Sequence, residues 1–181
     1  MCGIVGIFNP QGLEINNTKF ILEKMSNEIQ HRGPDNFGIW IDSSKGIGLA
    51  HRRLSILDKS KNGNQPMISK SKRYILIYNG EIYNHLELRN TMKGNIELDE
   101  YKSNSDTETF ITAIEELGLN NTLNVIRGMF AFALFDSKEN ILILGRDRMG
   151  QKPLYYGWNN NTFLFGSELK ALKIHPSFNN E

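Results

Sequence analysis

The sequence begins with Met1-Cys2-Gly3-Ile4-Val5-Gly6-Ile7-Phe8, a short uncharged segment that is followed by Asn9-Pro10-Gln11-Gly12. An apolar run of this length, bounded by turn residues, predicts a buried central strand. Chain ends usually fray. A terminus that is anchored in the core therefore indicates that this end of the chain has a task there.

Cys2 is the only cysteine of the chain. One interpretation is a small buried residue without reactivity, as free cysteines often are. The other begins with removal of Met1, which a side chain as small as that of Cys2 permits. The thiol and a free α-amine would then belong to one residue, and the amine could take the thiol proton directly or through a water. This is an established form of nucleophilic catalysis, and the anchored strand favours it.

Composition narrows the class of protein. A chain of 181 residues, 39% hydrophobic and 23% charged, is typical of one globular domain, here 2–181. A net charge of +1 from interspersed charges indicates neither nucleic acid nor membrane as a partner. The first segment is too short for a signal peptide or a membrane span. One cysteine fits a reducing cytoplasm, and the four histidines lack metal-ligand spacing, so no metal is predicted.

Apolar residues at spacings of three and four predict three helices, each preceded by a capping residue. The predicted caps are Asn17 or Thr18, then Asn84, then Ser105. Gly118 should end the third helix, and a short fourth helix is predicted from Ser167. A polar connection over 93–104 should separate the second helix from the third.

Runs of β-branched and aromatic residues between turn residues predict the strands. Three pairs are close enough in sequence to form hairpins: 37–41 with 47–56, 129–135 with 141–144, and 155–158 with 162–165. Another strand, 73–78, runs into Asn79-Gly80-Glu81. Few helices and many hairpin-linked strands predict an α+β fold with largely antiparallel sheet.

Seven short motifs occur in order along nearly the whole chain: Met1-Cys2-Gly3-Ile4-Val5-Gly6, His31-Arg32-Gly33-Pro34-Asp35, Arg53-Leu54-Ser55-Ile56, Tyr78-Asn79-Gly80-Glu81-Ile82-Tyr83-Asn84, Ser105-Asp106, Gly128-Met129-Phe130-Ala131-Phe132-Ala133 and Gly145-Arg146-Asp147-Arg148-Met149-Gly150. Each motif is common by itself. Together they resemble the glutaminase domain of asparagine synthetases, a class II glutamine amidotransferase. The resemblance implies the N-terminal-nucleophile hydrolase fold, a four-layer αββα sandwich of two mostly antiparallel sheets between helices.

The resemblance also implies the reaction, which is hydrolysis of L-glutamine to glutamate and ammonia. Cys2 would attack the side-chain amide, and its α-amine would carry the proton to the departing ammonia. Water would then hydrolyse the γ-glutamyl thioester. By the family match, the Asn79 side-chain amide and the Gly80 backbone N–H would stabilise the oxyanion.

The resemblance assigns substrate recognition as well. Arg53 would hold the α-carboxylate of glutamine, and Glu81 and Asp106 its α-ammonium. Arg52 is the rival of Arg53, and adjacent strand residues face opposite ways, so only one of them can reach the pocket. Asp106 could also be a charge favoured at a helix start, and Glu81 could be a solvated turn residue.

Two departures from the family pattern bear on the expectations. Asn104 stands where the family usually has glycine, and asparagine tolerates a left-handed backbone better than most residues. Nothing in the sequence resembles the Ser-Gly-Gly-x-Asp-Ser loop that binds ATP pyrophosphate in the synthetase half. The ATP-dependent synthetase domain is therefore expected to be absent from this chain, which needs no cofactor itself. ATP and magnesium are expected only for that missing part.

The expected partner is a synthetase domain or subunit that accepts the ammonia for asparagine synthesis from aspartate. The alternatives are a glutamine-binding remnant or regulatory subunit with little turnover, and an amidotransferase for an acceptor other than aspartate. A homodimer is compatible with the sequence.

Overall fold

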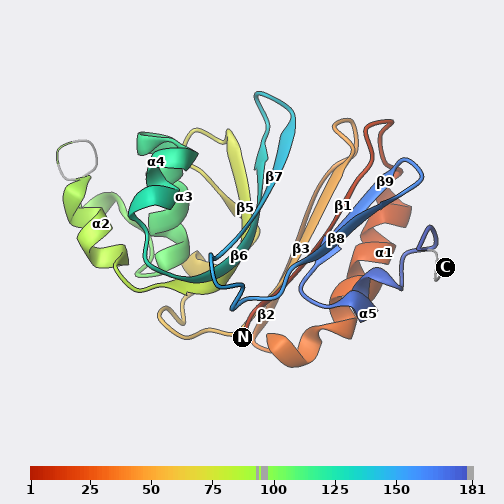
Figure 1. Ribbon diagram of the computed structural model, residues 1–181, viewed down its shortest axis with the longest axis horizontal. Helices are drawn as coiled ribbons and strands as arrows, with labels where there is room; N and C mark the ends of the chain where they lie inside the picture. The colour runs from red at the N-terminus through yellow and green to blue at the C-terminus, as the bar shows by residue number, and fades with distance from the viewer. Residues whose placement is uncertain (93, 95–97, 179–181) are drawn as a thin grey trace.

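The computed structural model describes residues 1–92, 94 and 98–178. Two sheets lie face to face between two groups of helices (Figure 1). The first has the spatial order β2 (Asn36–Asp42), β3 (Ile47–Arg53), β1 (Gly3–Phe8), β9 (Thr162–Gly166), β8 (Tyr155–Asn159). The second has the order β4 (Met67–Ile68), β5 (Tyr74–Ile82), β6 (Gly128–Asp136), β7 (Ile141–Arg146). Neighbouring strands of the described chain pair antiparallel, which confirms the predicted α+β sandwich.

The helices form the two outer layers. The first sheet is covered by α1 (Ile15–Glu28) and α5 (Leu169–Leu172), and the second by α2 (His85–Thr91), α3 (Asp106–Leu117) and α4 (Leu119–Val125) (Figure 1). Short 3₁₀ turns are η1 (Gln30–Arg32), η2 (Lys61–Gly63) and η3 (Leu98–Glu100). None of the helices in the described parts of the chain combines the length and apolarity needed to cross a bilayer.

Strand β1 lies in the middle of the first sheet, as predicted. Val5 is paired with Ala50 of β3 on one side and with Gly166 of β9 on the other. Alternate side chains of β1 enter different cores: Val5 packs under α1, whereas Ile4 packs between the sheets. Both are 0% exposed. The sheet therefore fixes the start of the chain, and Cys2 immediately precedes its central strand.

Several predicted boundaries were wrong. Helix α1 begins at Ile15, because the Glu14 carboxylate accepts the backbone N–H groups of Asn16 and Asn17 and so caps it. The predicted strand 47–56 ends at Arg53, because the chain beyond it leaves the sheet to form a loop.

The other differences concern α2 and two elements that were not predicted. Asn84 precedes α2, but its side chain does not cap the helix; it donates to Val125 O and accepts the Arg127 N–H. Helix α4 and strand β4 were missed. The predicted third and fourth helices and the three hairpins are present. The polar connection predicted over 93–104 lies in part outside the described residues.

Candidate active site

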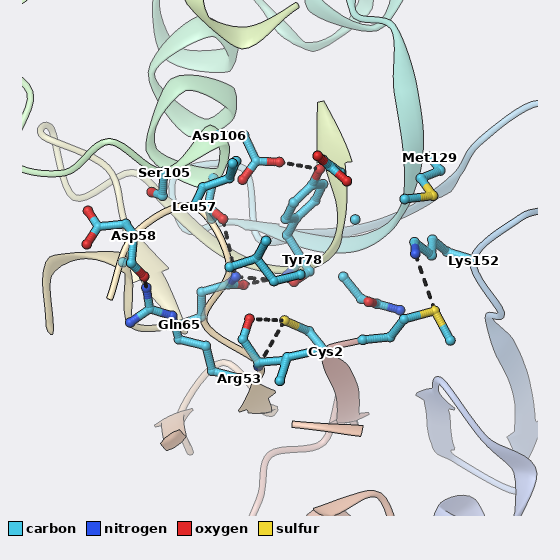
Figure 2. A pocket seen from close by; sticks show the side chains of 18 residues that line it. Cys2, Arg53, Leu57, Asp58, Gln65, Tyr78, Ser105, Asp106, Met129 and Lys152 are labelled. Atoms are coloured by element: carbon cyan, nitrogen blue, oxygen red, sulfur yellow. Dashed lines mark hydrogen bonds between the residues drawn. The ribbon is translucent and has the colours of Figure 1, made fainter. Parts of the chain in front are cut away.

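A pocket of about 150 Å³ opens where the starts of β1 and α3 approach the ends of β3 and β5. Its lining includes all six residues that the sequence singles out: Cys2, Arg53, Asn79, Gly80, Glu81 and Asp106. Figure 2 shows Cys2 and Arg53 on one side of this pocket and Asp106 on another. The fold thus brings together residues that lie far apart in the sequence, from the segment before β1 to the start of α3.

The Cys2 thiol lies against the backbone of Leu54. Its Sγ accepts the Leu54 N–H at 3.4 Å and donates to the Leu54 carbonyl oxygen at 3.7 Å. Burial raises the pKa of the Cys2 thiol, and the Leu54 N–H and the nearby α-amino group lower it in part. A thiol in this state needs a base to become a nucleophile.

The N-terminus itself supplies an amine at the pocket. Burial lowers the pKa of the Met1 α-amino group, the Cys2 thiolate raises it, and the positive charges of Arg32 and Lys152 lower it further. Arg32 also fixes the backbone here, because its Nε donates to the Cys2 carbonyl oxygen at 3.0 Å while its Nη1 pairs with Glu168 at 2.9 Å. The terminus is therefore held in place and is biased toward its neutral form.

Asn79 and Gly80 lie next to each other on β5. Asn79 is 1% exposed, and its Nδ2 has no hydrogen-bond partner among the described residues. An unpaired buried donor is costly and calls for an explanation, and an oxygen atom in the pocket would satisfy it. A Cβ on Gly80 would lie 2.5 Å from the carbonyl oxygen of Met129. Glycine is therefore required for close pairing with β6, a reason that the sequence did not reveal.

Arg53 and Arg52 point to opposite faces of β3. Arg53 lines the pocket, and its guanidinium donates to the loop that follows the strand: Nη1 to Ser60 O at 2.7 Å and to Asn64 Oδ1 at 2.8 Å, and Nη2 to Asp58 O. Arg52 instead reaches α1, where its Nε donates to Ser26 O at 3.2 Å. Only Arg53 is placed to meet a ligand, and it is fixed by the loop.

Asp106 is the first residue of α3, whose N-cap is Ser105. Its Oδ2 accepts the Tyr78 hydroxyl and the Ile82 N–H, each at 2.9 Å. Burial raises the pKa of the Asp106 carboxyl, and these two hydrogen bonds lower it in part. Glu81 is half-buried and lines the same pocket. The two acidic side chains make one part of the pocket suitable for a cation.

Among the pocket residues that were not predicted from the sequence are Gln65, Tyr78 and Lys152. The Gln65 side chain accepts the Tyr78 N–H at 2.6 Å and donates to the Tyr78 carbonyl oxygen at 3.2 Å, so it fixes the strand just before Asn79. Tyr78 is buried, and its hydroxyl orients Asp106. Gln65 and Lys152 lie in loops and Tyr78 lies in an apolar strand, so the sequence around them did not indicate a role in the pocket.

The described residues do not gather His, Cys, Asp or Glu side chains into a group of three or more that could hold a metal ion. The chemistry available in the pocket includes a thiol, the terminal amine, an unpaired amide N–H, the Arg53 guanidinium and the carboxylates of Glu81 and Asp106. This combination suits nucleophilic attack on the side-chain amide of an amino acid. The unpaired amide N–H can stabilise the oxyanion, and the guanidinium and the carboxylates can pair with the α-carboxylate and the α-ammonium.

Comparisons with known proteins agree with this geometry. A family described as "Glutamine amidotransferase domain" matches residues 1–181. A putative glutamine-hydrolysing asparagine synthetase of Methanocaldococcus jannaschii is 42% identical over 95% of this chain and 35% of its own length. Asparagine synthetase 2 of Bacillus subtilis is 40% identical over 97% of this chain and 23% of its own length, and asparagine synthetase B of Escherichia coli is 39% identical over 95% and 30%. The chain thus spans about a third or less of these relatives.

Solved structures share the fold at low sequence identity. Glutamine PRPP amidotransferase of Bacillus subtilis aligns with a TM-score of 0.76 at 19% identity, over 96% of this chain and 43% of that one. An allosteric regulatory enzyme of purine biosynthesis aligns with a TM-score of 0.77, also at 19% identity, with the same coverage of both chains. The resemblance to the glutaminase domain of asparagine synthetases is confirmed, and the chain belongs to the glutamine amidotransferase family.

Proposed function

We propose that this chain hydrolyses L-glutamine to glutamate and ammonia, with Cys2 as the nucleophile once Met1 has been removed. The observation that carries the proposal is the convergence on one pocket of the Cys2 thiol and the buried, unpaired Nδ2 of Asn79. A nucleophile and an oxyanion donor are two of the groups that amide cleavage by a thiol requires.

The reaction then proceeds in two halves. The α-amine of mature Cys2 accepts the thiol proton, and the sulfur attacks the side-chain carbonyl carbon of glutamine. Asn79 Nδ2 and the Gly80 N–H stabilise the oxyanion, and the C–N bond breaks as the α-ammonium returns its proton to the departing ammonia. Water attacks the thioester, releases glutamate and restores the thiol.

Arg53, Glu81 and Asp106 orient the substrate. The guanidinium pairs with the α-carboxylate, and the two acidic side chains hold the α-ammonium. The loop that binds Arg53 and the hydrogen bonds to Asp106 hold both sites rigid before substrate arrives. A fixed orientation supplies much of the rate of such reactions.

The acceptor of the ammonia lies outside the described pocket. The relatives are named asparagine synthetases and are about three to four times as long as the matched segment. We therefore propose that 2–181 acts as the glutaminase part of an asparagine synthetase, with aspartate, ATP and magnesium bound by a separate synthetase part.

The decisive experiment is an intact mass of the untagged protein after incubation with 6-diazo-5-oxo-L-norleucine, a glutamine analogue that alkylates nucleophiles. A mass that lacks one methionine and carries one adduct, with no adduct on the Cys2→Ala variant, supports the proposal. Loss of methionine without an adduct contradicts it. Calorimetric binding of glutamine without glutamate release would instead favour a glutamine-binding remnant.

The role of the α-amine is tested by the N-terminus. One tag is cleaved directly before Cys2 and a matched tag leaves a single glycine in front of it. The extended protein has an amide nitrogen in place of the amine, so its glutaminase activity should be lost. Equal activity of both proteins would contradict the proposed base.

A further inference from the structure

Lys152 is a buried lysine that faces the N-terminus. It is 6% exposed and lines the pocket together with Met1 and Cys2. Its Nζ contacts Met1 Sδ at 3.3 Å, which Figure 2 shows on the side of the pocket away from Arg53. A thioether is a weak acceptor, and Lys152 forms no salt bridge with a carboxylate of the described residues.

The loop that carries Lys152 is firmly built. The Asp147 carboxylate accepts the backbone N–H groups of Met149 at 3.1 Å, Gln151 at 2.9 Å and Lys152 at 3.1 Å. Arg146 Nε donates to the carbonyl oxygen of Lys152 at 2.6 Å. The backbone on both sides of Lys152 is therefore held by charged side chains, so its position beside the terminus is a defined feature of the loop.

Lys152 differs from Arg32 in having no ion-pair partner among the described residues. Arg32 also lies at the terminus, but it pairs with Glu168 at 2.9 Å, a carboxylate that it shares with His31 and Lys170. Asp35 and the Cys2 thiolate act in the opposite direction on the terminal amine, and the exposed Asp35 is screened by solvent. Lys152 is thus a buried positive charge at the N-terminus that forms no ion pair with a carboxylate of the described residues.

We propose that Lys152 is a positioning residue for the proposed glutaminase reaction. Its ammonium lies beside the mature α-amine of Cys2, and its charge favours the state in which the amine and the thiol have lost one of their two titratable protons. Removal of Met1 takes away the thioether that Lys152 contacts and leaves the free amine on Cys2, one residue closer to β1. Two neighbouring ammonium groups repel each other. The amine therefore stays neutral at a pH at which an isolated amine would be protonated.

The inference rests on the proposed function and is tested on the mature full chain. The rate of alkylation by 6-diazo-5-oxo-L-norleucine is measured from pH 5.5 to 9.5, with intact masses to verify that Met1 is absent from every variant. Lys152→Met removes a positive charge, so the α-amine and thiol of Cys2 should lose their first proton only at a higher pH. The acid limb of the profile should therefore move to higher pH, whether the remaining proton is on the amine or on the thiol. We expect a rate about three- to ten-fold lower at pH 6.5 and within about two-fold of wild type at pH 9.

Two variants separate charge from structure. Lys152→Arg keeps the charge and should restore the position of the acid limb, even if its maximal rate is lower. Lys138→Met removes an exposed lysine of the β6–β7 turn and should leave the profile unchanged. If Lys152→Met does not fold, Lys152→Gln provides the same loss of charge.

The outcomes are distinct. An acid limb that stays in place in the charge-removing variant, or that moves equally in Lys152→Arg, overturns the role of Lys152 and leaves the glutaminase proposal intact. A rate that Lys152→Met lowers by the same factor at every pH also overturns the role of Lys152 and leaves the glutaminase proposal intact, since it indicates a purely structural effect. Wild-type protein that is not alkylated at any pH overturns both proposals.

Discussion

A Cβ atom on Gly63 would lie 2.3 Å from Nη2 of Arg53. Gly63 ends the 3₁₀ turn η2, within the loop whose oxygens accept the hydrogen bonds of that guanidinium. The position of Arg53 in the pocket therefore depends on the absence of a side chain at position 63 in the following loop.

Gly63→Ala should weaken glutamine binding, because the new methyl group displaces the guanidinium and breaks hydrogen bonds of a charged donor. One such bond is worth about 1.5 to 3 kcal/mol, so we expect KM for glutamine to rise about ten-fold or more while kcat changes little. Steady-state glutaminase kinetics measure both. Gly157→Ala is the matched control, since nothing lies within 4 Å of a Cβ there. An unchanged KM in Gly63→Ala would contradict the role of Arg53.

Tyr78→Phe removes the hydroxyl that donates to Asp106 at 2.9 Å. This bond lowers the pKa of the Asp106 carboxyl, which burial raises, so its loss should move that pKa further up. The carboxylate must be ionised to hold the α-ammonium of glutamine. Binding to the variant should therefore weaken, and more at pH 5.5 than at pH 8.

Calorimetry on proteins that also carry Cys2→Ala checks this prediction without turnover. Tyr74→Phe is a suitable control, because Tyr74 lies at the other end of β5 and does not line the pocket. Equal weakening at both pH values would point to lost packing and not to the charge of Asp106.

Asn79→Ala should lower kcat by about a hundred- to a thousand-fold, the effect typical of removing one oxyanion donor. Its effect on glutamine affinity should be small, because the donor is needed most when the oxyanion forms. Asn79→Asp keeps the size of the side chain but replaces the donor by an acceptor, and it should be impaired at least as strongly. A variant that lost affinity and kept kcat would place Asn79 in substrate recognition.

His51 should make folding stability depend on pH. Its ring is 1% exposed, and Nε2 contacts the carbonyl oxygen of Tyr78 at 3.1 Å, so Nε2 must carry the proton of a neutral ring. Burial lowers the pKa of His51 to about 3. The unfolded chain binds the proton near pH 6.5, so between these values the unfolded state holds more protons, and stability falls as pH falls.

Because of this histidine, the free energy of unfolding should decrease by up to about 1.4 kcal/mol per pH unit below pH 6. Urea unfolding at pH 7.5, 6.5 and 5.5 measures it. His51→Gln keeps a donor for the Tyr78 carbonyl but cannot titrate, so its stability should decrease less steeply over this range. Parallel slopes for wild type and variant would show that another group is responsible.

Much of the architecture follows from local patterns in the sequence. The three hairpins have short polar turns between apolar runs, and the first strand has apolar residues on both faces because helix α1 and the second sheet cover it. Helix α4 was missed because Asn120, Asn121 and Asn124 are poor helix formers. Its stability comes from Leu119 and Leu123, which pack on the core around α3, and such tertiary contacts leave no local signal.

The site was predictable where chemistry and motif coincide. A cysteine next to the initiator and an Asn-Gly after a strand are visible in the sequence, whereas the orientation of Asp106 by Tyr78 is a contact across 28 residues. The loop oxygens that bind Arg53, and the lysine beside Met1, depend on how separate segments meet. Sequence patterns indicate which residues can react, and the packing determines which neighbouring residues hold and orient them.

Strand β1 is hydrogen-bonded on one side to β9, in which Val5 pairs with Gly166. During synthesis at about 5 to 20 residues per second, the partner strand leaves the ribosome only about ten to thirty seconds after the N-terminus. The first residue thus remains accessible to a processing aminopeptidase at least until β9 has been made, and Met1 is still 53% exposed once the sheet has closed. The order of strands in the sheet therefore leaves a period of synthesis in which removal of Met1 can precede closure of the sheet.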